Sequence, residues 1–191
     1  MKVEFSNQSI SFTRLADRLQ DHISSLVLTN VKLTGDDDDL YDFWKVLRGH
    51  PSLTEFLWSN VTFEDPNADV DRLMSVLFVS CPRLSRVVLD NVPVSASAIK
   101  AVEFSRTLRE VSLSNDHFSD QDACIIAGVL SRNTHLEKVD FRGNDLTEEG
   151  NKAFAACLKL NKSIQDVFLE KEGDALAVRN KLHRQNSASA A

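Results

Sequence analysis

The chain has 191 residues, of which 42% are hydrophobic and 26% charged, with a formal net charge of -6 and a sequence pI near 5.4. This acidic balance disfavours nucleic acid or an acidic membrane as a partner, because both require a clustered basic surface. No apolar run approaches the roughly 18 residues of a membrane span. The start, MKVEFSNQ, mixes charged and apolar residues and lacks the apolar core of a secretory signal. We therefore expect a cytoplasmic protein, with a nuclear or organellar location left open.

The chain begins with a strand pattern that then recurs along its whole length. Residues 3–10, VEFSNQSI, carry this pattern in a degenerate form. Six later units each open on an apolar residue, at intervals of 24 to 31 residues: Ile23, Leu53, Leu84, Leu108, Leu136 and Ile164. The third and fifth residues after each of these are also apolar, which predicts a short strand with one buried face. A period of this length is typical of a solenoid, and we expect seven strands.

The second half of a unit changes from period two to period 3.6. Apolar pairs four residues apart, which share one helix face, occur as Phe43/Leu47, Met74/Phe78, Ile126/Leu130 and Phe154/Leu158. Each unit is therefore predicted to be strand, turn and helix. We expect a single repeat domain of about seven units over residues 1–185 and a short flexible tail over 186–191.

This pattern resembles the leucine-rich repeats of the ribonuclease-inhibitor type. The unit that starts at Leu136 carries the whole signature: Leu136, Val139, Phe141, Asn144, Leu146, Gly150, Phe154, Leu158 and Asn161. The resemblance implies an α/β solenoid, a curved right-handed β-α superhelix with parallel strands on the concave face and helices on the convex face. We call the face of the sheet turned away from the helices the strand face.

The chain departs from the family at the buried asparagine of the turn, which only Asn144 supplies. The equivalent positions hold Val31, Val61, Val92 and Asp116. Asparagines recur one position earlier, and we expect their amides to bond nearby backbone at the corner between strand and turn: Asn7, Asn30, Asn60, Asn91 and Asn115.

Stacked strands align equivalent residues into columns on the strand face. The central column places Val27, Leu57 and Val88 side by side. Neighbouring aliphatic residues favour sheet pairing, but a contiguous exposed apolar patch also marks a docking site. A second column alternates in charge from strand to strand, through Glu55, Arg86, Glu110 and Lys138, and is joined on the same face by Asp140 and Arg142.

These columns predict a non-enzymatic protein-protein interaction scaffold whose strand face recognises a partner protein. The three apolar residues would anchor the partner, and the six charged residues would orient it. The family resemblance implies two alternatives, a GTPase-activating regulator of a small GTPase and a structural or filament-capping component such as an actin-end binder. The first strand also leaves Val3 and Phe5 near an uncovered edge, which favours self-association.

Sequence signatures of catalysis and of cofactor binding are missing. There is no Gly-rich phosphate loop, no HExxH and no GxSxG, so we expect no enzyme activity and no cofactor. The acidic run Asp36 to Asp39 lacks the glycine and terminal glutamate of a calcium loop and is interpreted as a helix start rather than a metal site.

Three further features are given structural interpretations. The basic residues Arg179, Lys181, His183 and Arg184 are interpreted as a solvated helix end. Trp58 lies in the inward column and is assigned to the core, whereas the position of Trp44 stays open. The three cysteines lack a CxxC pattern, and we expect free buried thiols at Cys81, Cys124 and Cys157.

Overall fold

The computed structural model describes residues 1–19, 22–159 and 161–169. Seven parallel strands form one sheet in sequence order: β1 (Lys2–Ser11), β2 (Ser25–Thr34), β3 (Glu55–Phe63), β4 (Arg86–Asp90), β5 (Glu110–Ser114), β6 (Lys138–Asp140) and β7 (Asp166–Phe168). The helices are α1 (Phe12–Arg18), α2 (Asp37–Leu47), α3 (Val70–Ser80), α4 (Ala96–Ile99), α5 (Asp120–Arg132) and α6 (Glu148–Leu158), and a 3-10 helix, η1 (Lys100–Phe104), follows α4.

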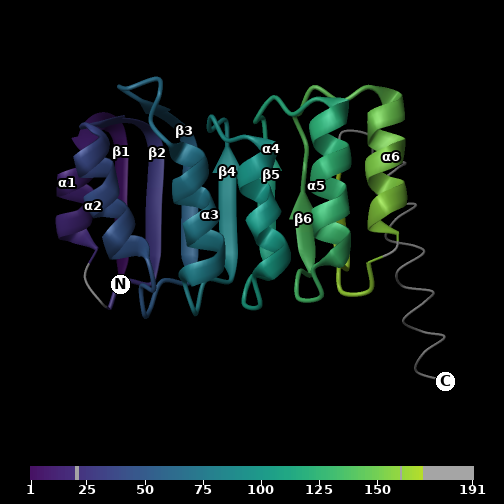
Figure 1. The fold of residues 1–191 in the computed structure, drawn as a ribbon, viewed down its shortest axis with the longest axis horizontal. Coiled ribbons are helices and arrows are strands. Elements are labelled where there is room, and N and C mark those ends of the chain that lie inside the picture. The colour runs from purple at the N-terminus through teal and green to yellow at the C-terminus, as the bar shows by residue number, and fades with distance from the viewer. Residues whose placement is uncertain (20–21, 160, 170–191) are drawn as a thin grey trace.

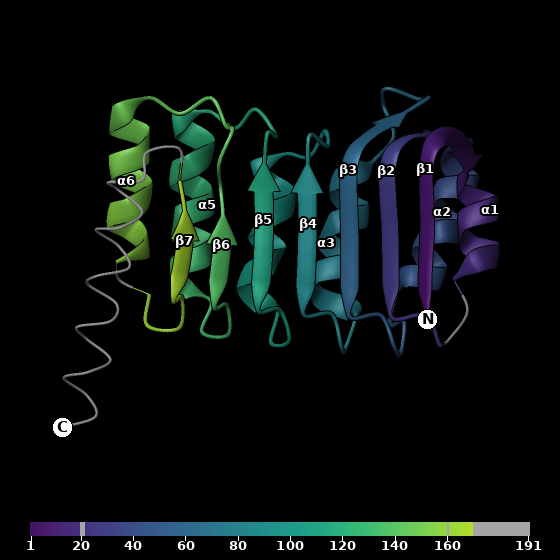
Figure 2. The same ribbon diagram turned by 180° about the vertical axis from the view of Figure 1, so that it is seen from behind.

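The helices lie along one face of the sheet (Figure 1), and the opposite face shows the strands uncovered (Figure 2). This arrangement confirms the predicted α/β solenoid, with parallel strands on one side, helices on the other and seven strands in the described sheet. The predicted end of the domain at residue 185, the tail 186–191 and the basic residues between Arg179 and Arg184 lie outside the described residues. None of the described helices is long and apolar enough to cross a membrane.

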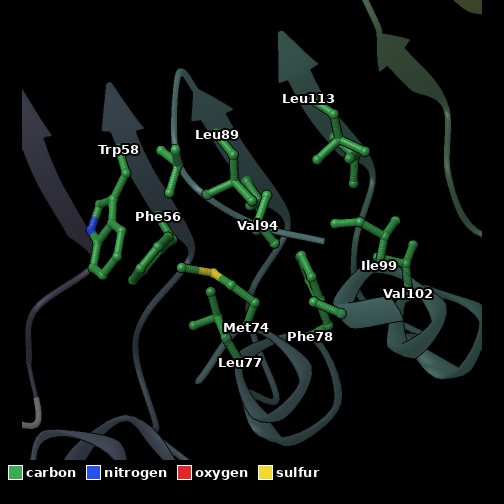
Figure 3. Packing of buried hydrophobic residues seen from close by; sticks show 14 of the residues in the cluster. Phe56, Trp58, Met74, Leu77, Phe78, Leu89, Val94, Ile99, Val102 and Leu113 are labelled. Carbon is green, nitrogen blue, oxygen red and sulfur yellow. The ribbon is translucent and has the colours of Figure 1, made fainter. Parts of the chain in front are cut away.

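The core lies between the sheet and the helices and runs the length of the array. Every leading apolar residue of the six later units is buried. Trp58 is fully buried, as predicted, and its ring centroid lies 4.6 Å from that of Phe56. Met74 and Phe78 of α3 reach into the same layer (Figure 3). Each unit therefore buries its apolar residues against its neighbours, which is how a solenoid gains stability.

The first three strands are nine or ten residues long, so the prediction of short strands is wrong there. Parallel pairing resumes after the corner asparagine, for example between Val31 and Val61. The chain turns at Asn30 and Asn60, whose φ angles of 52° are left-handed. Because the first three units turn in the same way, the residues that follow the corner pair again with those of the neighbouring strand. Pro93 follows the corner of the fourth unit and has no N–H to continue the ladder, so β4 ends at Asp90.

The side chains of four of the five corner asparagines bond to one another rather than to backbone, which corrects the prediction. The Asn30 amide donates to Asn7 Oδ1 at 2.9 Å, Asn60 donates to Asn30 at 2.9 Å, and Asn91 donates to Asn60 at 2.8 Å. Asn115 donates instead to Asp90 Oδ1 at 2.7 Å. Their left-handed backbone, which asparagine tolerates better than most residues, points these amides along the stack.

The acidic run before α2 is a helix cap, as interpreted from the sequence. Asp36 Oδ1 accepts hydrogen bonds from the backbone N–H groups of Asp38 and Asp39, and Asp39 Oδ2 accepts one from the N–H of Asp36. This reciprocal arrangement satisfies donors that a helix start leaves free. The carboxylates also lie at the positive end of the helix dipole.

Trp44 lies half-buried on the outer side of α2. Its ring stacks on Tyr41, with centroids 5.3 Å apart and an interplanar angle of 14°. The guanidinium groups of Arg48 and Arg72 lie 5.4 Å and 5.5 Å from its centroid. Trp44 therefore packs α2 against α3 through aromatic and cation–π contacts.

Two cysteine side chains are described, and they have opposite environments. Cys81 is buried, as predicted, and its thiol donates to the backbone oxygen of Leu47 at 3.2 Å. Burial raises the pKa of Cys81 to about 11. Cys124 is exposed, so the prediction of a buried thiol is wrong for it. The side chain of Cys157 lies outside what the structure describes.

We expect Cys124 to react with iodoacetamide at pH 8 at least ~100-fold faster than Cys81. The thiolate is the nucleophile, and the raised pKa of Cys81 keeps its thiol protonated. Burial also keeps the reagent away from Cys81. Peptide mapping by mass spectrometry after timed alkylation would measure both rates. Alkylation in denaturant, where the two thiols should react alike, is the control. Equal rates in the folded protein would contradict the burial of Cys81.

Candidate functional site: the strand face

The residues of the strand face align in the register that the sequence predicts. Val27 of β2 lies opposite Leu57 of β3, and Leu57 lies opposite Val88 of β4. We call these three residues the apolar column. Each is half-buried, so the column is a continuous but shallow stripe. Polar columns flank it on the same face, as at Glu55 and Ser59 on either side of Leu57.

The charged column forms a connected series of ion pairs, which we call the charge ladder (Glu55, Arg86, Glu110 and Lys138). Arg86 lies between two carboxylates, with nitrogen–oxygen distances of 4.0 Å to Glu55 and 3.2 Å to Glu110. Lys138 Nζ lies 3.0 Å from the other oxygen of Glu110. Partly exposed pairs of this kind contribute only about 0–1 kcal/mol each to stability. Their larger effect is a patterned surface potential that can orient a partner.

Glu110 is the centre of the charge ladder. Burial by itself raises the pKa of this carboxyl, but the hydrogen bonds and charges of Lys138 and Arg86 outweigh burial and lower it. Glu110 is therefore ionised at neutral pH. The ladder presents fixed charges of alternating sign across β3 to β6.

Asp140 and Arg142 lie beyond the ladder and form a bidentate pair. Arg142 Nε and an Arg142 terminal nitrogen donate to the two oxygens of Asp140 at 2.9 Å and 2.6 Å. The Arg142 guanidinium also lies 5.2 Å from the ring centroid of Phe168 in β7, and Lys138 Nζ lies 5.6 Å from the same ring. The structure thus brings the predicted Lys138, Asp140 and Arg142 together around an aromatic ring.

Phe168 was not among the predicted site residues, although its signal was present. It occupies the central column, opposite Asp140 in the neighbouring strand. The repeat pattern predicts the column of Phe168, but it does not predict that Lys138 and Arg142 approach its ring. The strand face therefore has two parts, the apolar column over β2 to β4 and a charged and aromatic region over β5 to β7.

Asp116 is a second residue that the site prediction missed. It is the one buried carboxylate among the described residues, at 9% exposure. Its Oδ1 accepts from the backbone N–H of Val92 at 2.9 Å, but Oδ2 has no hydrogen-bond partner. Burial above all, and the nearby charge of Asp90, raise the pKa of Asp116 to about 8. The displaced-asparagine pattern already marked this position as unusual.

The equivalent residue in the next unit shows what an asparagine does here. The Asn144 amide donates to the backbone oxygens of Leu113 at 2.7 Å and Phe141 at 3.0 Å. Its Oδ1 accepts from the N–H groups of Asp116 at 3.1 Å and Phe118 at 3.2 Å. Asn144 therefore joins two units through four hydrogen bonds, whereas the Asp116 carboxyl accepts one from Val92 and leaves Oδ2 without a partner.

Among residues 1–19, 22–159 and 161–169, no group of three or more histidine, cysteine, aspartate or glutamate residues is placed to hold a metal ion.

No protein-family model matches the chain, and no curated protein sequence matches it. Among solved structures, the chain is similar to one described as leiomodin-1 actin-binding site 2. The two are 15% identical, the likeness covers 94% of this chain and 90% of that chain, and the TM-score is 0.47.

Proposed function

We propose that this chain is a non-enzymatic protein-recognition module, an array of the ribonuclease-inhibitor type whose strand face binds a partner protein. The observation that supports this best is the apolar column of Val27, Leu57 and Val88. The three residues lie in adjacent strands on the face that the helices leave uncovered. Apolar surface of this kind, bordered by polar residues, is the usual centre of a protein interface.

The charge ladder supports the same face. Its charges are held in place by the ion pairs between Glu55, Arg86, Glu110 and Lys138. A partner that approaches the apolar column would meet this fixed pattern along one side and the pair of Asp140 and Arg142 further along the array. Complementary charges set orientation and association rate more than affinity.

The test is the triple substitution Val27→Asp/Leu57→Asp/Val88→Asp, compared with the parent protein in affinity capture from cell lysate. Three carboxylates in the apolar column should abolish partner binding, because a partner would have to bury them unpaired. Circular dichroism must first show that the variant is folded. A partner retained equally by the folded variant would contradict a strand-face interface.

A matched control places the same substitutions on the helical side. Val79, Phe104 and Ile125 are exposed apolar residues of α3, η1 and α5. The variant Val79→Asp/Phe104→Asp/Ile125→Asp adds the same charge and should keep full capture. Loss of the partner from this variant alone would assign the interface to the helices instead.

A further inference from the structure

A pocket of about 440 Å³ lies at the carboxyl end of β3 and beyond the end of β4, between residues of three successive units. Its walls are largely apolar and include Val61, Phe63 and Pro93. Asp65 and Asp116 also line it. Its volume falls within the roughly 300–1,000 Å³ that is usual for ligand sites, which also combine apolar walls with a few polar groups. We call it the Asp116 pocket.

The carboxyl group of Asp116 is incompletely bonded within the fold. Its Oδ2 is buried without a hydrogen-bond partner, although Oδ1 is used by the N–H of Val92. At the equivalent place in the next unit, both ends of the Asn144 amide are used. A buried polar atom without a partner destabilises the folded state. Residues that break a local rule without a compensating contact concentrate at functional sites.

The backbone around the pocket includes three left-handed residues. Asn91, Asn115 and His117, which line it, have left-handed φ angles of 54°, 56° and 59°. The left-handed φ of Asn91 and Asn115 recurs at the corners of the other units, whereas His117 is the one described histidine with a left-handed φ. The exposed His117 ring has Nδ1 at 3.3 Å from Asp145 Oδ2.

The charges of the residues that line the pocket indicate which kind of ligand it binds. The described residues that line the pocket include two carboxylates, Asp65 and Asp116, and neither lysine nor arginine. The histidine of the lining is already beside a carboxylate of its own. A cation with an apolar stem therefore complements both the walls and the charge, since lysine and arginine bury their methylene groups along apolar surface.

We propose that the Asp116 pocket binds a lysine or arginine side chain of a partner protein, with the stem against Val61, Phe63 and Pro93 and the cationic head at Asp116. This site goes beyond the strand-face interface and stands on different residues. It lies at the ends of the strands, so a partner on the strand face could use it as well. The two proposals can fail separately.

The test titrates the folded chain with n-butylammonium and n-butylguanidinium, which copy the two side chains, and with uncharged n-butanol. Binding is followed at low salt and pH 8.5, above the pKa of about 8 that burial gives Asp116, by the amide NMR signals of Val92, Asp116 and His117. We expect saturable shifts for one or both cations with a Kd in the millimolar range, as the small number of ligand atoms allows. n-Butanol should bind at least 10-fold more weakly. Equal shifts with n-butanol, or no saturable shift with either cation, would overturn the proposal.

Asp116→Asn separates binding from a purely structural role. The variant should lose at least 10-fold in cation affinity while its stability increases, because asparagine can make the bonds of Asn144 but carries no charge. Glu137→Gln, which removes an exposed carboxylate paired with Arg109, should leave cation binding unchanged. Unchanged cation affinity in folded Asp116→Asn would overturn the assignment. The strand-face triple variant should bind n-butylammonium normally, so failure of one proposal does not imply failure of the other.

Discussion

Replacing Asp116 with asparagine should stabilise this protein at neutral pH, and the gain should grow as the pH rises from about 4 to about 8. Burial raises the pKa of Asp116 to about 8 in the folded chain, from an ordinary value of 3.8. Between these values the folded chain holds a proton that the unfolded chain has released. The free energy of unfolding of the parent protein therefore falls with rising pH through this window, by at most about 1.4 kcal/mol per pH unit from this group.

The asparagine variant has no such proton to lose. Its amide can also donate to backbone oxygens, as the Asn144 amide does to those of Leu113 and Phe141. We expect a gain of about 2 kcal/mol or more at pH 7, a smaller gain at pH 5 and the full gain above pH 8. Urea unfolding of both proteins at pH 5, 7 and 8.5 measures these differences.

The comparison needs a control for the other carboxylates. Glu137 is exposed and pairs with Arg109 at 3.4 Å, so Glu137→Gln should change stability by less than about 1 kcal/mol at every pH. A difference between parent and Asp116→Asn that stays constant from pH 5 to pH 8.5 would show that Asp116 does not titrate in this window.

Replacing Asn144 with alanine should cost about 3–5 kcal/mol, because four backbone groups lose their partner at once. Two of these groups belong to Leu113 and Phe141, which are buried, so water cannot easily replace the amide. Denaturant unfolding followed by far-UV circular dichroism measures the loss.

Asn115→Gly is the matched control for this substitution. Asn115 is exposed, has a φ angle of 56° and donates one side-chain bond, to Asp90. Glycine keeps the left-handed backbone and removes only that bond, at a cost of about 1 kcal/mol. If Asn144→Ala costs no more than Asn115→Gly, then Asn144 does not join the units in the way its hydrogen bonds indicate.

The repeat period of the sequence was sufficient to place the strands and to set their register. Leu57 lies between Val27 and Val88, as the spacing of the leading residues predicts. The order of charges in the ladder follows from the same period, since residues at equal distances from Leu53, Leu84 and Leu108 must align when the units stack. This part of the candidate site is a consequence of local spacing alone.

The side chains around Asp140 show where that reasoning ends. The period gives the columns of Arg142 and Phe168, but the contact between them also depends on the rotamers of a long side chain and on the bidentate bond to Asp140. The exposure of Cys124 was missed for a related reason. A helix turn carries both buried and exposed positions, and only the packing of α5 against its neighbours decides which of them water can reach.

The Asp116 pocket depends on tertiary structure most of all. Val61, Phe63, Pro93 and Asp116 come from three successive units, and their approach depends on how the left-handed corners turn the loops. The sequence by itself determined the fold, the sheet register and the columns of the strand face, because these follow from a repeated pattern of apolar residues. Only the tertiary structure decided the exposure of each side chain, the bonds of the corner asparagines and the unpartnered Asp116 oxygen, because these depend on contacts between residues far apart in the chain.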